Sequence, residues 1–184
     1  MKTYTKKGDS GQTDDGRGGR IPKGHPQVVA LGDLDELNSQ VGLCVSSARA
    51  AQDGQVAEAL KPVQGELMTL AAKLSGNPAA VDLELGADAA ARMERQIDSI
   101  RAKLPPLTKF VIPAGCQLAC QLHVARSVCR RAERAMATLA ASGGSMDKVA
   151  LAYVNRLSDL LFALARLANL NAGCDEQTWS SSHP

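Results

Sequence analysis

The strongest constraint on the fold is the periodic spacing of small and apolar side chains between Gln117 and Met136. Leucine, alanine, cysteine and methionine recur there at three- and four-residue intervals, which predicts an amphipathic helix. At 100° per residue the recurring positions lie within about 80° of one another and form one core-facing stripe. The stripe consists of Leu118, Leu122, Ala125, Cys129, Ala132 and Met136.

The composition favours further helices as the packing partners of this one. Aromatic residues make up only 3% of the chain, β-branched runs are scarce, and alanine and leucine are prominent. Small and medium side chains of this kind pack helices better than they fill a sheet. A chain of 184 residues is long enough for one domain with its own core and too short for two comfortable ones.

Four other segments carry a helical pattern. The first is expected to begin at Asp33, whose carboxylate would cap the helix while Glu36 reaches back to it. Pro62 is expected to bend the second helix or to mark a late start. These four segments and the helix from Gln117, which is expected to end at Gly143-Gly144, predict an all-α, five-helix up-and-down bundle in a single domain spanning 1–184. The four helices cover residues 33–50, 55–74, 87–104 and 146–171, within a bundle of residues 32–172 that is followed by a loosely held tail, 173–184.

Net charge and cysteine usage limit the function classes. A formal charge of +2 provides no global field to attract nucleic acid or an anionic membrane, so neither is an expected partner. Five scattered cysteines without a CxxC pair fit a reducing compartment. The polar N-terminus does not resemble a signal peptide, and no apolar run approaches the length of a membrane span. These features predict a cytoplasmic protein.

A second stripe on the 117–141 helix concentrates positive charge. Arg126, Arg130, Glu133 and Arg134 fall together about 100° round from the apolar stripe, whereas Arg131 lies on neither. Guanidinium groups stacked along one flank repel each other unless an anion sits between them, and they grip phosphate oxygens well. Alternatively, Glu133 and neighbouring acids neutralise a solvated face, which is the commoner arrangement. The residues alone leave both interpretations open.

The N-terminal segment, residues 1–31, is expected to be irregular and rich in glycine. It is either a floppy tail or a phosphate-binding loop, because bare backbone amides, hydroxyls and ammonium groups together can wrap phosphates. It contains no P-loop sequence, GxxxxGK[ST].

Two smaller patterns also have alternative explanations. Cys116, Cys120 and His123 have a spacing that could bind zinc, but a fourth ligand is not evident and buried thiols are common between packed helices. The last helix has a polar stripe that indicates either a wet cleft, a contact between subunits or a satisfied buried network. This stripe comprises Asn155, Asp159, Phe162, Arg166 and Asn169.

Four ordered blocks of sequence resemble one enzyme family. FVIPAG, HVAR and RRAER follow one another between Phe110 and Arg134; YTKKGDSGQT and LGDLDELNSQVG precede them, and NRLSDLLFALARLAN follows. This pattern resembles the PduO-type ATP:cob(I)alamin adenosyltransferases, or corrinoid adenosyltransferases, over nearly the whole chain.

The resemblance implies transfer of the 5′-deoxyadenosyl group of ATP to the cobalt of cob(I)alamin, which yields adenosylcobalamin and triphosphate. It implies Mg²⁺ accompanying ATP, and a homotrimer with active sites between subunits. It also implies transient contact with a reductase that supplies cob(I)alamin from cob(II)alamin and with a cobalamin-dependent acceptor enzyme.

The resemblance also assigns site residues. Asp35 becomes the partner of Arg126 across a subunit boundary, although an acid in a first helical turn is also explained by the helix dipole. Phe110 packs beneath the corrin and, with Asp35, Arg126 and Arg130, belongs to the catalytic set. The ATP contacts implied are Thr5, Lys6, Lys7, Gly8, Thr13, Asp14, Lys23, Arg130, Glu133, Arg134 and Asn155.

Two rival functions are consistent with the same residues. One is a non-catalytic bundle that binds a nucleotide or a corrinoid, which would form no product. The other is a purely structural helical oligomer, which would gain no thermal stability from Mg-ATP.

Overall fold

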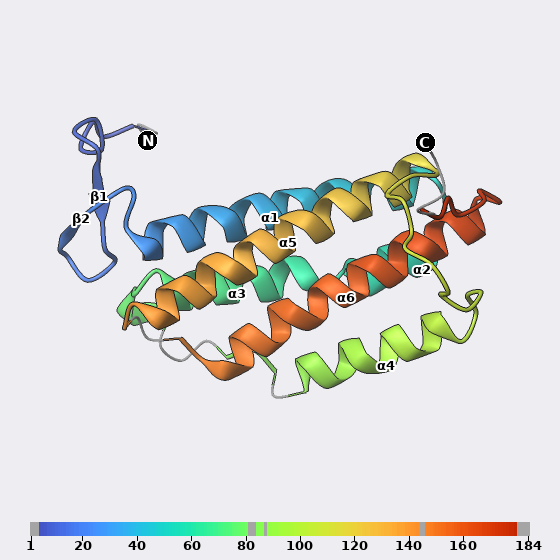
Figure 1. Ribbon diagram of the computed structural model, residues 1–184. Coiled ribbons are helices and arrows are strands. Elements are labelled where there is room, and N and C mark those ends of the chain that lie inside the picture. Colours follow the sequence, from blue (N-terminus) through green and yellow to red (C-terminus); the bar gives the residue numbers. More distant parts are fainter. Residues whose placement is uncertain (1–3, 81–83, 87, 144–145, 180–184) are drawn as a thin grey trace.

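The computed structural model, which describes residues 4–80, 84–86, 88–143 and 146–179, is a helical bundle with one small β-hairpin (Figure 1). The all-α prediction is confirmed. Helix α5 (Gln117–Ala141) packs against both α1 (Pro26–Ala50) and α6 (Lys148–Asn171), while α3 (Val63–Leu74) lies beside α1 and α4 (Ala89–Arg101) beside α6. A short helix α2 (Gly54–Leu60) and a 3-10 turn, η1 (Pro78–Ala80), complete the bundle.

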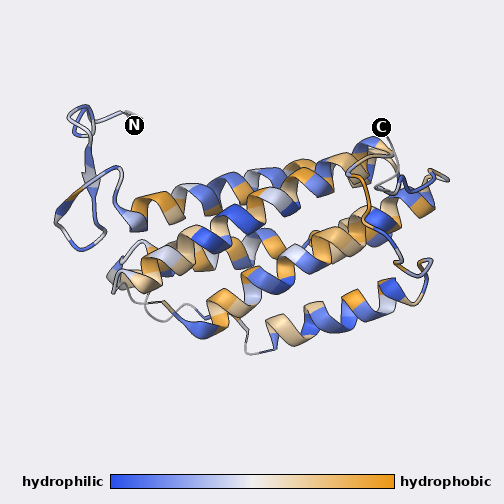
Figure 2. Ribbon diagram, viewed as in Figure 1, coloured by the Kyte–Doolittle hydropathy of each residue, from blue (hydrophilic) through white to orange (hydrophobic). Residues whose placement is uncertain are grey.

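Helix α6 forms the centre of the core. It buries side chains around most of its circumference, including Tyr153, Leu157, Leu161 and Leu164. The apolar stripe predicted on α5 is buried as expected, from Leu118 to Met136. Figure 2 shows apolar residues alternating with polar ones along α4, which covers the bundle with one face only. None of the described helices is both long and apolar enough to cross a membrane.

Helix α1 begins earlier than the sequence predicts. Pro26 occupies its first turn, and the His25 ring nitrogen Nδ1 accepts a hydrogen bond from the backbone amide of Gln27 at 3.2 Å. Proline suits this position because its missing N–H would have no intrahelical partner there. The predicted capping box at Asp33 is therefore wrong. Asp33 and Glu36 instead form ion pairs with Arg131 of α5, which fasten α1 to α5.

The predicted helix 55–74 is two helices. Helix α2 ends at Leu60 and α3 begins at Val63, so Pro62 marks the late start that was one of its two expected effects. Proline lacks the amide proton that a continuous helix requires. The remaining helices match their predictions within a few residues. Asp147 caps α6, and Gly143, with φ of 85°, follows the end of α5.

The N-terminal segment is more regular than expected. Strands β1 (Gln12–Asp14) and β2 (Arg20–Pro22) pair antiparallel, with Thr13 opposite Ile21. The hairpin projects beyond the start of α1 at one end of the bundle (Figure 1). The expected boundary near residue 31 moves to His25, where α1 is capped.

The described part of the predicted tail, residues 173–179, is held against the rest of the chain and is not loose. Gln177–Trp179 lies antiparallel to Phe110–Ile112, joined by two backbone hydrogen bonds of 2.8 Å. The side chain of Glu176 is paired with Arg166 of α6. Residues 180–184 of the predicted tail lie outside the described residues.

Candidate functional site

The predicted stripe of Arg126, Arg130 and Arg134 on α5, here called the arginine flank, is present and is not neutralised by any described residue. Arg130 and Arg134 are exposed and Arg126 is half-buried. Among the residues that the structure describes, none of the three forms an ion pair. The acids that face α5 from α1 pair with Arg131 instead. The flank is therefore a concentration of positive charge open to an anion.

Glu133 is turned away from the arginines toward α6. Its Oε1 atom accepts a hydrogen bond from Nδ2 of Asn155 at 2.7 Å. The other end of that amide, Oδ1, accepts from Nη1 of Arg156 at 3.0 Å, and Arg156 also pairs with Glu94 and Asp159. The structure thus brings Glu133 and Asn155 together, beside the arginine flank, in a defined orientation.

A second group gathers around Phe162 of α6. The guanidinium carbon of Arg126 lies 5.9 Å from the centre of the Phe162 ring, within the range of a cation–π contact. The His123 ring lies 6.1 Å from it and is only 3% exposed. Burial, assisted by the positive charge of Arg126, lowers the pKa of His123, so its neutral form is favoured. Both ring nitrogens of His123 and Nε of Arg126 are buried with no hydrogen-bond partner among the described residues.

The loop before α5 presents Phe110 to solvent. Its side chain is 80% exposed, while the neighbouring backbone is tied to the tail. Asn169 of α6 holds the end of the loop, because its amide donates to Ala114 O at 3.0 Å and accepts from Cys116 N at 2.9 Å. A side chain with this exposure does not act as a plug over the end of the bundle.

Gly115→Ala is expected to disrupt this loop. Gly115 has φ of 117°, and a Cβ atom there would lie 2.0 Å from Asn169 Oδ1. Backbone strain alone costs about 1–3 kcal/mol, and displacement of Asn169 adds the loss of two hydrogen bonds. The matched control is Gly143→Ala, with φ of 85° but no described atom within 4 Å of the new Cβ, which is expected to suffer only the strain. Chemical denaturation of the two variants measures the difference; equal losses would contradict the steric argument.

The N-terminal residues predicted to hold phosphate form a compact turn. A Cβ placed on Gly8 would lie 3.4 Å from Lys23 Nζ, so the two residues meet, and Lys6 adopts φ of 60°. Thr13 sits in β1, and Asp14 Oδ1 accepts from the amide of Gly16 at 2.7 Å. Thr5 and Lys7 are exposed beside this turn.

The structure does not join the two halves of the predicted ATP site. Among the described residues, no hydrogen bond or ion pair links the segment before α1 to Arg126, Arg130 or Arg134. Asp35 is exposed on α1 and likewise pairs with none of these arginines within the chain.

The cysteines near the start of α5 have structural contacts. The thiol of Cys116 accepts the amide of Ala119 at 3.4 Å and caps the helix, and it also contacts Ala168 O at 3.6 Å. No group of three or more potential metal-ligating His, Cys, Asp or Glu side chains was found among the described residues. Cys120 contacts the carbonyl of Gly115 at 3.7 Å.

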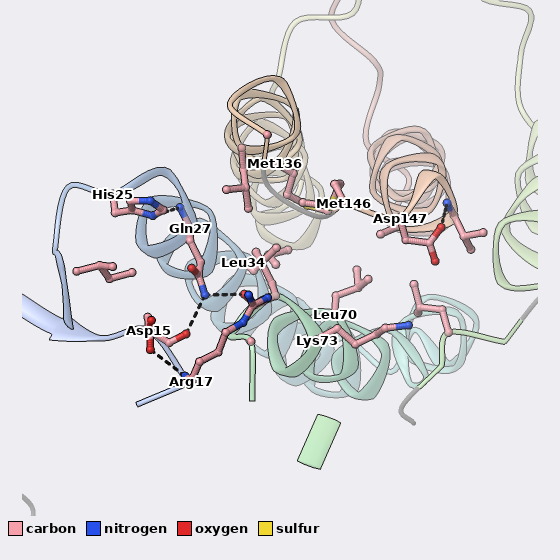
Figure 3. A pocket seen from close by; sticks show the side chains of 18 of the residues that line it. Asp15, Arg17, His25, Gln27, Leu34, Leu70, Lys73, Met136, Met146 and Asp147 are labelled. Carbon is pink, nitrogen blue, oxygen red and sulfur yellow. Dashed lines mark hydrogen bonds between the residues drawn. The ribbon is translucent and has the colours of Figure 1, made fainter. Parts of the chain in front are cut away.

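A cleft of about 890 Å³ lies elsewhere, between the base of the hairpin and the ends of α3, α5 and α6 (Figure 3). Two of its lining residues are joined by a hydrogen bond, which the Gln27 side chain donates to Leu74 O at 3.0 Å. Its lining combines charged side chains, such as Arg17, Lys73 and Asp147, with apolar ones. The described residues that line it include none of the predicted site residues, so volume alone does not locate this site.

Comparison with known proteins identifies the family. A family model described as cobalamin adenosyltransferase matches residues 3–168. The chain belongs to the cobalamin adenosyltransferase family. It is 39% identical to the cobalamin adenosyltransferase of Cupriavidus metallidurans, over 97% of this chain and 94% of that protein. The corrinoid adenosyltransferase of Bacillus subtilis is 38% identical, with 99% of this chain and 94% of that protein covered.

Two further comparisons concern PduO-type members of the cobalamin adenosyltransferase family. A Lactobacillus reuteri ATP:corrinoid adenosyltransferase variant, in which histidine replaces a phenylalanine, was solved in complex with cobalamin and ATP. It superposes with a TM-score of 0.87 at 32% identity, covering 99% of this chain and 98% of that one. PduO of Citrobacter freundii is 39% identical over 94% of this chain, but the chain spans only 51% of that protein.

Three residues important to the local geometry of this family member were not predicted as site residues. Arg156 orients Asn155, and its only sequence signal is its position beside Asn155 in NRLSD. Phe162 was noted only as part of the polar stripe. Glu176 lies beyond every periodic segment, so no pattern could pair it with Arg166 before the fold was known.

Proposed function

We propose that this chain is an ATP:corrinoid adenosyltransferase, transferring the 5′-deoxyadenosyl group of ATP to the cobalt of cob(I)alamin. The observation that carries the proposal is the arginine flank of α5, whose three guanidinium groups have no acid partner among the described residues. Triphosphate is the leaving group of this reaction and carries the charge that such a flank would neutralise.

The chemistry requires little from the protein beyond positioning. Cob(I)alamin is itself a strong nucleophile: its cobalt attacks C5′ of ATP, a cobalt–carbon bond forms, the C5′–oxygen bond breaks, and triphosphate leaves with the electron pair. The protein must hold C5′ in line with cobalt and stabilise the departing charge. In the proposal Arg130, Arg134 and Lys23 contact the triphosphate, and Glu133 and Asn155, held together by their hydrogen bond, contact the nucleotide.

The N-terminal residues surround the phosphates from the other side. Thr5, Lys6, Lys7, Gly8 and Thr13 provide amides, hydroxyls and ammonium groups for this. Mg²⁺ enters with ATP and would neutralise phosphate charge. Magnesium is often held by one or two carboxylates plus substrate phosphates, and the exposed Asp14 carboxylate, with one oxygen already bonded to Gly16, fits that limited role.

We further propose a homotrimer in which the N-terminal segment of one subunit meets α5 of its neighbour. The separation of the two halves of the site within one chain supports this arrangement, as does the exposure of large apolar side chains on α1 and α5, such as Val29, Leu43 and Val124. A reductase and a cobalamin-dependent acceptor enzyme would contact the trimer transiently. All five cysteines are unpaired, which fits a cytoplasmic location.

Asp35→Asn tests the arrangement between subunits. If Asp35 pairs with Arg126 of a neighbour, the variant loses activity and subunit association together. If Asp35 only complements the helix dipole, the loss is about 0.3–1 kcal/mol of stability without effect on catalysis. Asp35 now lies well inside α1, which begins at Pro26, so the dipole explanation is weaker than the sequence indicated. Sedimentation and turnover are measured on the same sample, and unchanged values in both would exclude the pair.

The function itself is tested by anaerobic incubation with ATP and chemically reduced cobalamin, followed spectroscopically for adenosylcobalamin. Formation of adenosylcobalamin and an equal amount of triphosphate is expected. A non-catalytic binding protein would be stabilised thermally by Mg-ATP but form no product, and a structural oligomer would show neither effect.

A further inference from the structure

Phe110 combines an exposed side chain with a firmly attached backbone. The ring is 80% exposed, yet the carbonyl of Phe110 accepts the amide of Trp179 at 2.8 Å, and the amide of Ile112 donates to Gln177 O at 2.8 Å. Exposed apolar rings on free loops sample many positions, and this one is restricted by the strand that pairs with it. The attachment of the tail therefore restricts the backbone from which the Phe110 ring projects.

The tail is in turn fixed by a buried ion pair. Arg166 of α6 is 6% exposed and donates from Nε to Glu176 Oε1 at 2.7 Å and from Nη2 to Oε2 at 2.8 Å. The same Nη2 donates to Pro105 O at 2.9 Å, at the start of the loop that carries Phe110. One guanidinium thus contacts both segments that lead into the bridge, the loop at Pro105 and the tail at Glu176.

The contact between Arg166 and Glu176 is buried and is made through two hydrogen bonds, so it can fix the position of the tail. A two-point Arg–carboxylate pair fixes orientation as well as distance. Breaking a buried pair from one side leaves an uncompensated charge, which favours detachment of the partner segment. Glu176 directly precedes Gln177, the first residue of the strand that pairs with Phe110–Ile112 through two backbone hydrogen bonds. Release of the Glu176 carboxylate would therefore release that strand.

We propose that Arg166 and Glu176 are positioning residues for Phe110, acting through the paired tail strand to hold its ring at the corrin side of the site. The inference rests on the proposed function and on the place beneath the corrin that the family resemblance implies for Phe110. It predicts that the pair affects the cobalamin half of the reaction and leaves the ATP half unchanged.

The first test needs no ligand, because Trp179 is the single tryptophan and reports on the tail strand. Glu176→Gln is expected to lower the fluorescence anisotropy of Trp179 and raise its quenching by acrylamide. Glu58→Gln is the matched control, since Glu58 pairs with Lys61 in an exposed contact on α2. Unchanged Trp179 signals in a folded Glu176→Gln protein would overturn the proposal. If that variant does not fold, Glu176→Asp, which keeps the charge but withdraws the carboxylate, is expected to shift both signals in the same direction.

The second test is a double-mutant cycle between Phe110 and Glu176. Glu176→Gln is expected to raise KM for cobalamin about tenfold, with KM for ATP unchanged. It should also lower the electron paramagnetic resonance signal of four-coordinate cob(II)alamin, the form without a lower axial ligand. Added to Phe110→Ala, it should have little further effect, because residues that act through one another are not additive. Fully additive effects would overturn the proposal. If Phe110→Ala leaves the cobalt signal intact, the proposed role of Phe110 fails. If Phe110→Ala lowers that signal but Glu176→Gln does not, only the positioning role of Arg166 and Glu176 is refuted.

Discussion

Arg130→Ala abolishes turnover and weakens ATP binding by about 10- to 150-fold, because one charge-assisted phosphate contact is worth about 1.5–3 kcal/mol. Arg130 is exposed in the middle of α5, with no acid partner among the described residues, so its removal leaves no buried group unpaired. Helical content and the melting temperature without ligand should therefore stay unchanged. Calorimetric titration with ATP and the anaerobic adenosylation assay measure the two effects.

Two variants make this result specific. Arg130→Lys keeps the charge but loses the paired geometry of the guanidinium, so it should fall between wild type and alanine. Arg131→Ala, one residue along the same helix, breaks the ion pairs to Asp33 and Glu36 and should lower stability while ATP still binds. Near-normal adenosylation by a folded Arg130→Ala protein would reject the phosphate interpretation of the arginine flank.

The helical core was predictable because its signals are local. The spacing of apolar residues predicted α5 and α6, and the position of Pro62 predicted an irregularity where α2 and α3 are separate. The start of α1 was misplaced because Asp33 and Glu36 satisfy a local capping rule, while their carboxylates are in fact used by Arg131, far away in sequence. Local rules cannot rank a cap against a tertiary ion pair. The start at Pro26 was readable in principle, since proline is favoured in a first turn.

The candidate site was predictable only in part, for the same reason. Spacing on one helix placed Arg126, Arg130 and Arg134 on a common flank, but it could not tell whether acids from other helices would neutralise them. The packing of the helices decides this. Asp33 and Glu36 of α1 pair with Arg131, and Glu133 accepts a hydrogen bond from Asn155. The contacts of Phe110 depend on a tail that has no periodic pattern, and so they emerged only from the fold.

Phe110→Ala is expected to separate the reduction of cobalt from the binding of ATP. In the proposed site the ring packs beneath the corrin and excludes the lower axial ligand. Without that ligand cobalt(II) is easier to reduce, because electron donation from below favours the higher oxidation state. The variant should bind ATP almost normally and lose activity mainly when the assay starts from cob(II)alamin. Electron paramagnetic resonance should detect less four-coordinate cobalt(II) than in wild type.

The exposure of Phe110 makes this test sharper than the sequence alone allowed. Full burial of a phenylalanine contributes about 1.5–3 kcal/mol, but a ring that is 80% exposed contributes only a small part of that, so stability should hardly change. Leu107→Ala is the matched control, a 54% exposed apolar side chain on the same loop, and should leave the cobalt signal intact. Equal losses from cob(I)alamin and cob(II)alamin, or an undiminished four-coordinate signal, would remove Phe110 from the cobalt chemistry. We would then expect the exposed ring to pack at an interface between subunits, because it contributes little to the stability of its own chain.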